Sequence, residues 1–155
     1  MHELHTQRRI EFADTDMAGI VHFARFFIFM ETAEHEFLRA LGTPVHFPHE
    51  GNEVGWPRIA ASCEYRSPAR LGDVLDIHLQ VKRKGRRAMT YAVTFRCGER
   101  LVAEGEISSI FCALPWKPAE DEPQERRPRP VPIPGFLADS IETAPRFTEP
   151  TADRG

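Results

Sequence analysis

Apolar residues recur every three or four positions between residues 23 and 41. This stripe, interrupted by the charged residue Glu34, consists of Phe23, Phe26, Phe27, Met30, Ala33, Phe37, Leu38 and Leu41. The spacing predicts an amphipathic helix of about five turns. Gly42 and Pro44 follow it, a glycine suited to the position just past a helix and a proline that prevents continuation. So many phenylalanines on one face indicate a helix that other structure covers closely.

Elsewhere the apolar residues alternate with polar ones, which is typical of half-buried strands. A first strand is predicted over residues 4–13, and four more are predicted over residues 58–65, 74–82, 88–97 and 101–113. Short links at Gly85 and Gly98 indicate antiparallel hairpins, whereas proline and glycine make residues 45–57 loop-like. The long helix must cover one face of the sheet. We therefore expect an α+β domain, a strongly curved antiparallel sheet around one central helix.

A length of 155 residues favours one domain with a substantial core. Nine of the thirteen prolines lie in the last 41 residues. We expect a single domain over residues 1–143, with a proline-rich extension from about residue 115. A brief helix is expected behind Pro134, with Phe136, Leu137 and Ile141 on one face. Residues 144–155 are expected to form a disordered tail.

Composition excludes several classes of function. The net charge of −3 argues against a general nucleic-acid binder. The longest apolar run is far shorter than the ~20 residues of a membrane span, so no stable membrane insertion is expected. The three cysteines are an odd, widely spaced set, and the N-terminus lacks the apolar region of a secretory signal. These features predict a cytoplasmic protein without a disulfide framework.

One stretch concentrates groups that are able to do chemistry. The sequence ADTDMAGIVHF places Asp14, Asp16 and Gly19 directly before the predicted helix. A helix start offers unpaired N–H groups and a partial positive charge. A carboxylate facing such donors is suited to attack on a carbonyl, directly or through an activated water. The same residues are also compatible with a purely structural Asx turn.

A family resemblance rests on this stretch. IEFADTDMAGIVHFARFF resembles the 4-hydroxybenzoyl-CoA thioesterase family, including its Tol-Pal-associated branch, and YRSPARLGDVLDIHLQVKRKGRRAMTY is similar to a second block of that family. The resemblance covers about residues 7–114. It implies the hotdog fold, hydrolysis of acyl-CoA thioesters, and dimers that pair into tetramers. Hotdog domains also include dehydratases and binding proteins, so the fold alone does not establish the activity.

The resemblance also implies roles for individual residues. It places the catalytic carboxylate on Asp16, as nucleophile or general base, and an oxyanion-type donor at the backbone N–H of Phe23. Gly19 allows the sharp turn and the close approach of a ligand to the backbone. Asp14 is expected to brace the turn. For His22, a packing or hydrogen-bonding role is favoured over a catalytic one.

Substrate contacts are expected further along the chain. The acyl group is expected beside Phe26 at a subunit interface. Glu31 either faces the site or pairs across a dimer, or it lies on a solvated face or forms a local ion pair. Arg86 and Arg87 belong to a basic run on a hairpin, and they either bind the phosphates of coenzyme A or are solvated charges. The expected partners are an acyl-CoA substrate and further copies of the chain, in a homodimer or homotetramer.

No cofactor and no metal site are expected. His46 and His49 have a ligand-like spacing, but they lie in a proline-containing loop without a further ligand cluster. Neither a serine-hydrolase motif nor a phosphate-binding glycine loop is present. Two other functions stay open. One is a hotdog hydratase or dehydratase that uses Asp16 with His22 for proton transfer, and the other is a non-catalytic acyl-CoA-binding protein. The residues admit an aliphatic or an aromatic acyl group.

Overall fold

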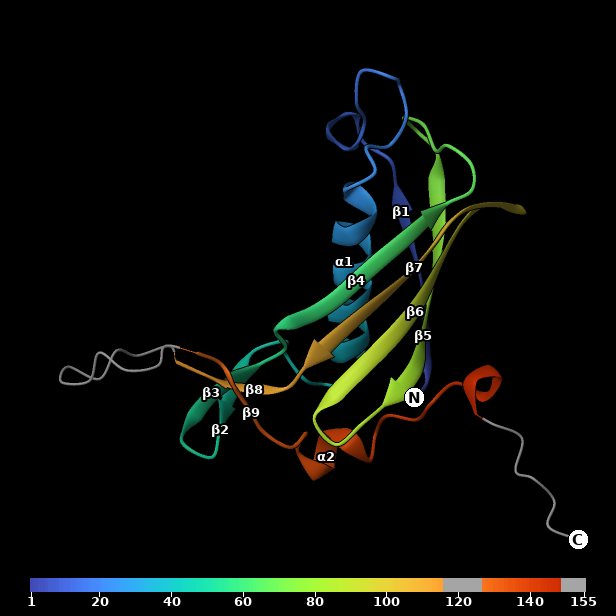
Figure 1. Cartoon of the computed structure of the whole chain (residues 1–155). Coiled ribbons are helices and arrows are strands. Elements are labelled where there is room, and N and C mark those ends of the chain that lie inside the picture. The colour runs from blue at the N-terminus through green and yellow to red at the C-terminus, as the bar shows by residue number, and fades with distance from the viewer. Residues whose placement is uncertain (116–126, 149–155) are drawn as a thin grey trace, which may run out of the picture.

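The computed structural model describes residues 1–115 and 127–148, and a five-stranded antiparallel sheet forms its centre (Figure 1). In spatial order the strands are β1 (Glu3–Arg9), β5 (Val74–Lys84), β6 (Ala88–Cys97), β7 (Arg100–Ile110) and β4 (Arg58–Tyr65). Tight hairpins join β5 to β6 and β6 to β7, at the glycines that predicted them. β1 and β4 are therefore the two edges of the sheet.

Helix α1 (Arg25–Ala40) lies across one face of this sheet (Figure 1). Its buried apolar side chains are Phe26, Phe29, Met30, Ala33, Phe37 and Leu38. Phe95 of β6 meets Phe26 edge to face at 5.2 Å between ring centroids, and Tyr91 meets Phe37 at 5.6 Å. Such aromatic pairs contribute about 0.5–1.5 kcal/mol each beyond the area that they bury. The predicted α+β arrangement, one long helix against an antiparallel sheet, is confirmed.

Both ends of α1 lie close to the predicted positions. Phe23 precedes the helix and is 61% exposed, because the chain is still turning there. At the other end Gly42 has a φ of +76°, its N–H donates to the Arg39 carbonyl (2.9 Å), and the Thr43 N–H donates to the Leu38 carbonyl (3.0 Å). This pair of bonds is a Schellman motif. The prediction that Gly42 ends the helix is confirmed.

The first strand is shorter than the sequence predicted. It ends at Arg9 instead of residue 13. The Ile10 N–H still donates to the Asp73 carbonyl opposite it (2.8 Å), but the Asp73 N–H donates to the Arg70 carbonyl (3.0 Å) and not back to Ile10, so the ladder stops there. Residues Phe12–Asp14 then form a 3-10 turn, η1. The alternation of apolar residues therefore continued beyond the point at which the backbone leaves the sheet.

A second sheet of four strands was not predicted. It consists of β2 (Phe47–His49), β3 (Asn52–Gly55), β8 (Cys112–Leu114) and β9 (Arg129–Pro130). The expected loop over residues 45–57 thus contains a hairpin, and Pro48 is tolerated there because β2 is an edge strand. The expected single strand over residues 101–113 is broken at Phe111, whose N–H donates to the Arg87 carbonyl.

The region after residue 127 is more regular than its proline content predicted. Helix α2 (Gly135–Ala138) follows Pro134 as expected. Leu137 and Ile141 are buried, but Phe136 is 59% exposed and does not share their face. No helix within residues 1–115 and 127–148 is long and apolar enough to cross a membrane.

The ordered structure continues beyond residue 144, where the sequence predicted that a disordered tail begins. Ala144 is fully buried, and its N–H donates to the Val81 carbonyl (2.8 Å). A 3-10 turn, η2 (Pro145–Phe147), follows it. The rest of the expected tail, residues 149–155, and part of the proline-rich extension, residues 116–126, lie outside the described residues.

Glu34, the charged residue on the buried face of α1, is fully partnered. Its side chain is 2% exposed, and Arg58 Nη2 lies 2.7 Å from Oε2. The Ser109 hydroxyl donates to Oε1 (2.8 Å) and accepts a hydrogen bond from Arg58 Nη1 (2.6 Å). A buried carboxylate needs such partners, because leaving it unpaired is costly. The network ties α1 to β4 and β7, next to the edge of the sheet.

Candidate active site

The stretch between η1 and α1 folds into a tight loop. Gly19 has a φ of +74°, a conformation that glycine adopts without steric penalty, and its N–H donates to the Asp16 carbonyl (2.9 Å). Thr15 and Val21 close the loop through an isolated antiparallel bridge. The conformational reason predicted for Gly19 is confirmed.

Asp14 anchors this loop from inside the protein. Its Oδ1 accepts hydrogen bonds from Arg25 Nε (2.9 Å) and Nη2 (2.7 Å), and its Oδ2 accepts the Glu11 N–H (2.9 Å). Burial raises the pKa of the Asp14 carboxyl, but the bonds from Glu11 and Arg25 and the charges of Arg8 and Arg25 outweigh burial and hold the pKa below its usual value. The expected bracing role of Asp14 is confirmed.

Asp16 lines a pocket of about 520 Å³ at the N-terminal end of α1. The other lining residues are Ile20, Val21, Phe23, Phe26, Tyr65, Arg66, Ser67, Pro68, Ala69 and Arg70. Asp16 is exposed, and its Oδ1 accepts the Ala18 N–H (2.9 Å). Within the part of the chain that the structure describes, Oδ2 makes no hydrogen bond. One carboxylate oxygen is therefore free to act on a ligand in the pocket.

Two hydrogen bonds hold the loop against the end of β4 and the segment that follows it. The Val21 N–H donates to the Ala69 carbonyl (2.8 Å), and the Tyr65 hydroxyl donates to the Phe23 carbonyl (3.0 Å). Burial, together with the neighbouring Cys63, raises the pKa of Tyr65 to about 12, so the hydroxyl keeps its proton. Phe23 is thus restrained by a residue 42 positions away in the sequence.

The backbone N–H of Phe23 makes no hydrogen bond with any described residue, whereas both neighbouring N–H groups are used. The His22 N–H donates to the Asp14 carbonyl (2.9 Å), and the Ala24 N–H donates to His22 Nδ1 (3.2 Å). A free N–H at the entrance to a helix is a ready donor for a ligand oxygen.

The His22 side chain contacts the neighbouring backbone and not the pocket. Its ring accepts the Ala24 N–H and lies against the Phe23 ring, 4.7 Å between centroids. It does not line the pocket. These contacts favour the packing and hydrogen-bonding role over the catalytic one.

Two groups of residues predicted for substrate binding lie away from this pocket. Glu31 is exposed, and its Oε1 lies 4.0 Å from Arg58 Nη2. This contact is the local ion pair, one of the roles considered for Glu31. Arg86 and Arg87 follow β5, which starts beside the end of β1 and runs about 35 Å in its 11 residues. Their hairpin is therefore at the opposite end of the sheet from the loop (Figure 1).

Sequence reasoning missed the far wall of the pocket. Tyr65 is the last residue of β4, and Arg66 and Arg70 come from the segment after it. Arg70 Nη1 lies 3.5 Å from the Gly19 carbonyl oxygen. The only signal was the block YRSPAR, part of the second family-like stretch. The two arginines place positive charge beside Asp16.

We expect Asp14→Asn to weaken the fold in a pH-dependent way. The folded pKa of Asp14 lies below its ordinary value of 3.8, so the unfolded chain binds the proton more tightly. The stabilisation is therefore complete well above pH 3.8 and is lost as pH falls through the folded pKa. Losing the charged acceptor is expected to lower the free energy of unfolding at pH 7 by about 2 kcal/mol.

Urea unfolding of both proteins between neutral and acid pH measures this difference. The gap between wild type and variant should narrow in acid, and Asp16→Asn, at an exposed position in the same loop, should show little effect at any pH. A gap that stayed constant through the acid range would contradict the assignment.

Comparisons with known proteins identify the family of this chain. The family model of the thioesterase superfamily matches residues 18–109. A 1,4-dihydroxy-2-naphthoyl-CoA hydrolase of Prochlorococcus marinus (strain MIT 9303) is 32% identical over 124 residues, covering 70% of this chain and 82% of that protein.

Two solved structures show the same fold. A 1,4-dihydroxy-2-naphthoyl-CoA thioesterase from Synechocystis superposes with a TM-score of 0.71 at 22% identity, over 87% of this chain and 92% of that one. A 4-hydroxybenzoyl-CoA thioesterase variant in complex with 4-hydroxybenzoyl-CoA superposes with a TM-score of 0.66 at 19% identity. That match covers 88% of this chain and 97% of the other. The predicted hotdog fold is confirmed. The family match runs from the loop through α1 to β7 and so includes the segment that builds most of the pocket. It covers more than half of the chain, and the chain therefore belongs to the thioesterase superfamily.

Proposed function

We propose that this protein hydrolyses acyl-CoA thioesters in the pocket between the loop and Tyr65. One observation carries the proposal: a carboxylate with a free oxygen, on Asp16, and a residue whose backbone N–H has no described partner, Phe23, line the same pocket. Hydrolysis of a thioester needs both a group that delivers the nucleophile and a donor for the oxygen that becomes negative. Membership of the thioesterase superfamily supports the same reaction class.

The reaction has a simple form if Asp16 is a general base. The carboxylate takes a proton from a water molecule while the water oxygen adds to the thioester carbon. The carbonyl oxygen becomes negative and accepts the Phe23 N–H. Collapse of this intermediate breaks the carbon–sulfur bond, and the departing thiolate takes up a proton to give free coenzyme A and the acid.

Asp16 is equally placed to act as the nucleophile. Its free oxygen then adds to the thioester carbon, the thiolate leaves, and a mixed anhydride forms on the protein. Water hydrolyses the anhydride in a second step and restores the carboxylate. A single turnover in ¹⁸O-labelled water tests for the nucleophilic route. Water that attacks the aspartyl carbonyl of the anhydride leaves label in the Asp16 side chain, whereas general-base catalysis places label only in the product acid.

We further propose an aromatic acyl group. The pocket has an aromatic wall, in which Phe26 meets Tyr65 edge to face at 5.6 Å and the Phe23 ring is 61% exposed. Exposed aromatic rings at a pocket favour stacking with a planar ligand. The Prochlorococcus relative is a hydrolase of a naphthoyl thioester by name, so benzoyl and naphthoyl thioesters come first in a substrate panel.

A second copy of the chain is expected to complete the site. β4 is an unpaired edge of the sheet, and apolar side chains are exposed on it and beside it: Ile59 is 58% exposed and Ile28 of α1 is 45% exposed. Antiparallel pairing of two β4 strands about a two-fold axis covers both. Because such pairing reverses the partner, it brings the partner's Arg86 and Arg87 to the pocket end. A homodimer, or two such dimers, is the expected assembly.

Asp16→Asn is expected to lower kcat for the best acyl-CoA about 10²- to 10⁴-fold. KM and thermal stability should stay close to wild type, because the side chain is exposed and its shape is preserved. Asp139→Asn, an exposed aspartate after α2, is the matched control and should keep full activity. Coenzyme A release by a thiol reagent is the measurement.

The same panel distinguishes the other enzyme class. A hydratase or dehydratase changes the absorbance of the acyl double bond without releasing thiol. If wild type releases thiol from none of the thioesters, while Asp16→Asn binds them equally well, the hydrolase proposal is wrong.

Phe23→Pro removes the proposed oxyanion donor, while Phe23→Ala keeps it. We expect the proline variant to lose about 10²- to 10³-fold in kcat. The alanine variant should mainly raise KM, because it loses the ring but retains the N–H. Steady-state kinetics of the two variants, with circular dichroism as a check on folding, decide the matter. Equal kcat values would remove the Phe23 amide from the mechanism.

The double variant Arg86→Ala/Arg87→Ala is expected to raise KM for the acyl-CoA about 5- to 10-fold, since charge-assisted contacts to phosphate are lost. KM for the corresponding acyl-pantetheine, which lacks the nucleotide phosphates, should not change. Arg66→Ala/Arg70→Ala is the matched comparison, because these arginines lie at the pocket of the same chain. If only that second pair shows the CoA-specific change, the proposed role of Arg86 and Arg87 is wrong.

A further inference from the structure

A cluster of potential metal ligands lies on the side of the sheet that α1 leaves uncovered. In β5 the buried residues Ile77 and Leu79 face α1, so His78 between them faces the other way. His5 of β1 is the direct cross-strand partner of His78. Glu3 precedes His5 by two residues and therefore shares its face. The strand register brings together three residues that span 75 positions of sequence.

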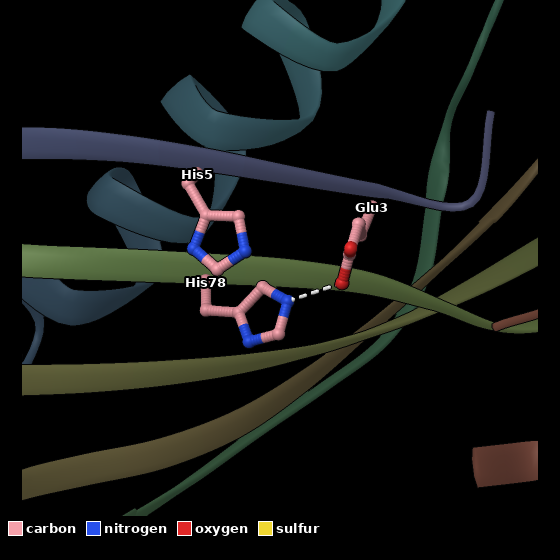
Figure 2. Close-up of side chains that lie close together, drawn as sticks. All are labelled: Glu3, His5 and His78. Carbon is pink, nitrogen blue, oxygen red and sulfur yellow. Dashed lines mark hydrogen bonds and ion pairs between the residues drawn. The ribbon is translucent and has the colours of Figure 1, made fainter. Parts of the chain in front are cut away.

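The three side chains already touch (Figure 2). The His5 and His78 rings stack with centroids 4.0 Å apart and an interplanar angle of 14°. His78 Nε2 lies 2.7 Å from Glu3 Oε2. One ligand atom from each residue falls within 4.8 Å of the other two. All three side chains are at least partly exposed, so they are free to adjust and an ion reaches them from solvent.

Two imidazoles and one carboxylate form a ligand set that zinc prefers. Ligand bonds of about 2.0–2.2 Å in a tetrahedral arrangement require ligand atoms about 3.3 Å apart. The observed spacing therefore needs only side-chain rotation by these exposed groups to close around an ion. Three protein ligands leave the fourth position to water.

His5 and His78 line a pocket of about 400 Å³ that also contains Asp76, Arg96 and Arg146, so groups of both charges surround the cluster. Arg96 donates to the Glu99 carbonyl, and Arg146 stacks on Phe147 at 4.4 Å. His2 Nε2 lies 3.6 Å from Glu3 Oε1, beside the other oxygen of the same carboxylate.

We propose that Glu3, His5 and His78 bind a divalent transition-metal ion of the zinc type and thereby fasten the edge strand β1 to β5. The cluster does not line the pocket of Asp16, and it lies on the opposite face of the sheet from α1. Metal binding therefore stabilises the fold without entering the hydrolytic step. Because the unfolded chain does not hold the three ligands together, the ion favours the folded state.

The test is a zinc titration of the full chain, freed of any affinity tag and stripped with a chelator. Isothermal titration calorimetry should show one saturable site per chain, and zinc should raise the midpoint of thermal unfolding. His5→Ala and His78→Ala should each weaken binding at least tenfold, with Glu3→Gln weakening it less. Cobalt in place of zinc should give the visible absorption of a four-coordinate ion.

His46→Ala/His49→Ala is the matched control, since it removes the other closely spaced pair of histidines and should leave the affinity unchanged. Circular dichroism checks that each variant is folded, and because His5 is exposed, His5→Ala is expected to leave the fold intact. The proposal is overturned if wild type shows no saturable site, or if His5→Ala or His78→Ala binds zinc as tightly as wild type. Neither result bears on thioester hydrolysis.

Discussion

The burial of one face of α1 against the five-stranded sheet is the interaction on which the rest of the structure depends. Phe29, Phe37 and Leu38 are fully buried in that contact, and each such side chain contributes about 1.5–3 kcal/mol relative to an exposed one. The contact fixes the axis of α1. It thereby fixes the helix entrance, where Phe23, whose N–H has no partner among the described residues, lines the same pocket as Asp16.

The site itself is assembled by polar contacts at the rim of this core. Asp14 binds Arg25 at the start of α1 and the Glu11 N–H at η1, so the loop is held at both of its ends. Tyr65, at the end of β4, donates a hydrogen bond to the Phe23 carbonyl. Groups held this way need little rearrangement when charge develops on a bound thioester, which is the condition for effective electrostatic stabilisation.

The two edges of the sheet have contrasting chemistry. β4 carries apolar residues such as Ile59, which suits pairing with a second copy. β1 carries Glu3 and His5 opposite His78, which suits an ion. The proposed assembly and the proposed metal site thus protect opposite edges, and only the first of them is linked to the hydrolytic pocket.

The sequence by itself determined the local features. The 3.6-residue period located α1, Gly42 marked its end, and the seven-residue separation of Asp16 and Phe23 already placed carboxylate and amide on one loop. Tertiary structure alone decided that Tyr65 faces that loop, that Arg86 and Arg87 lie at the far end of the sheet, and that Glu3, His5 and His78 meet. Periodicity specifies which face of an element is buried, whereas strand pairing and register depend on contacts between residues far apart in the chain, and no local pattern encodes them.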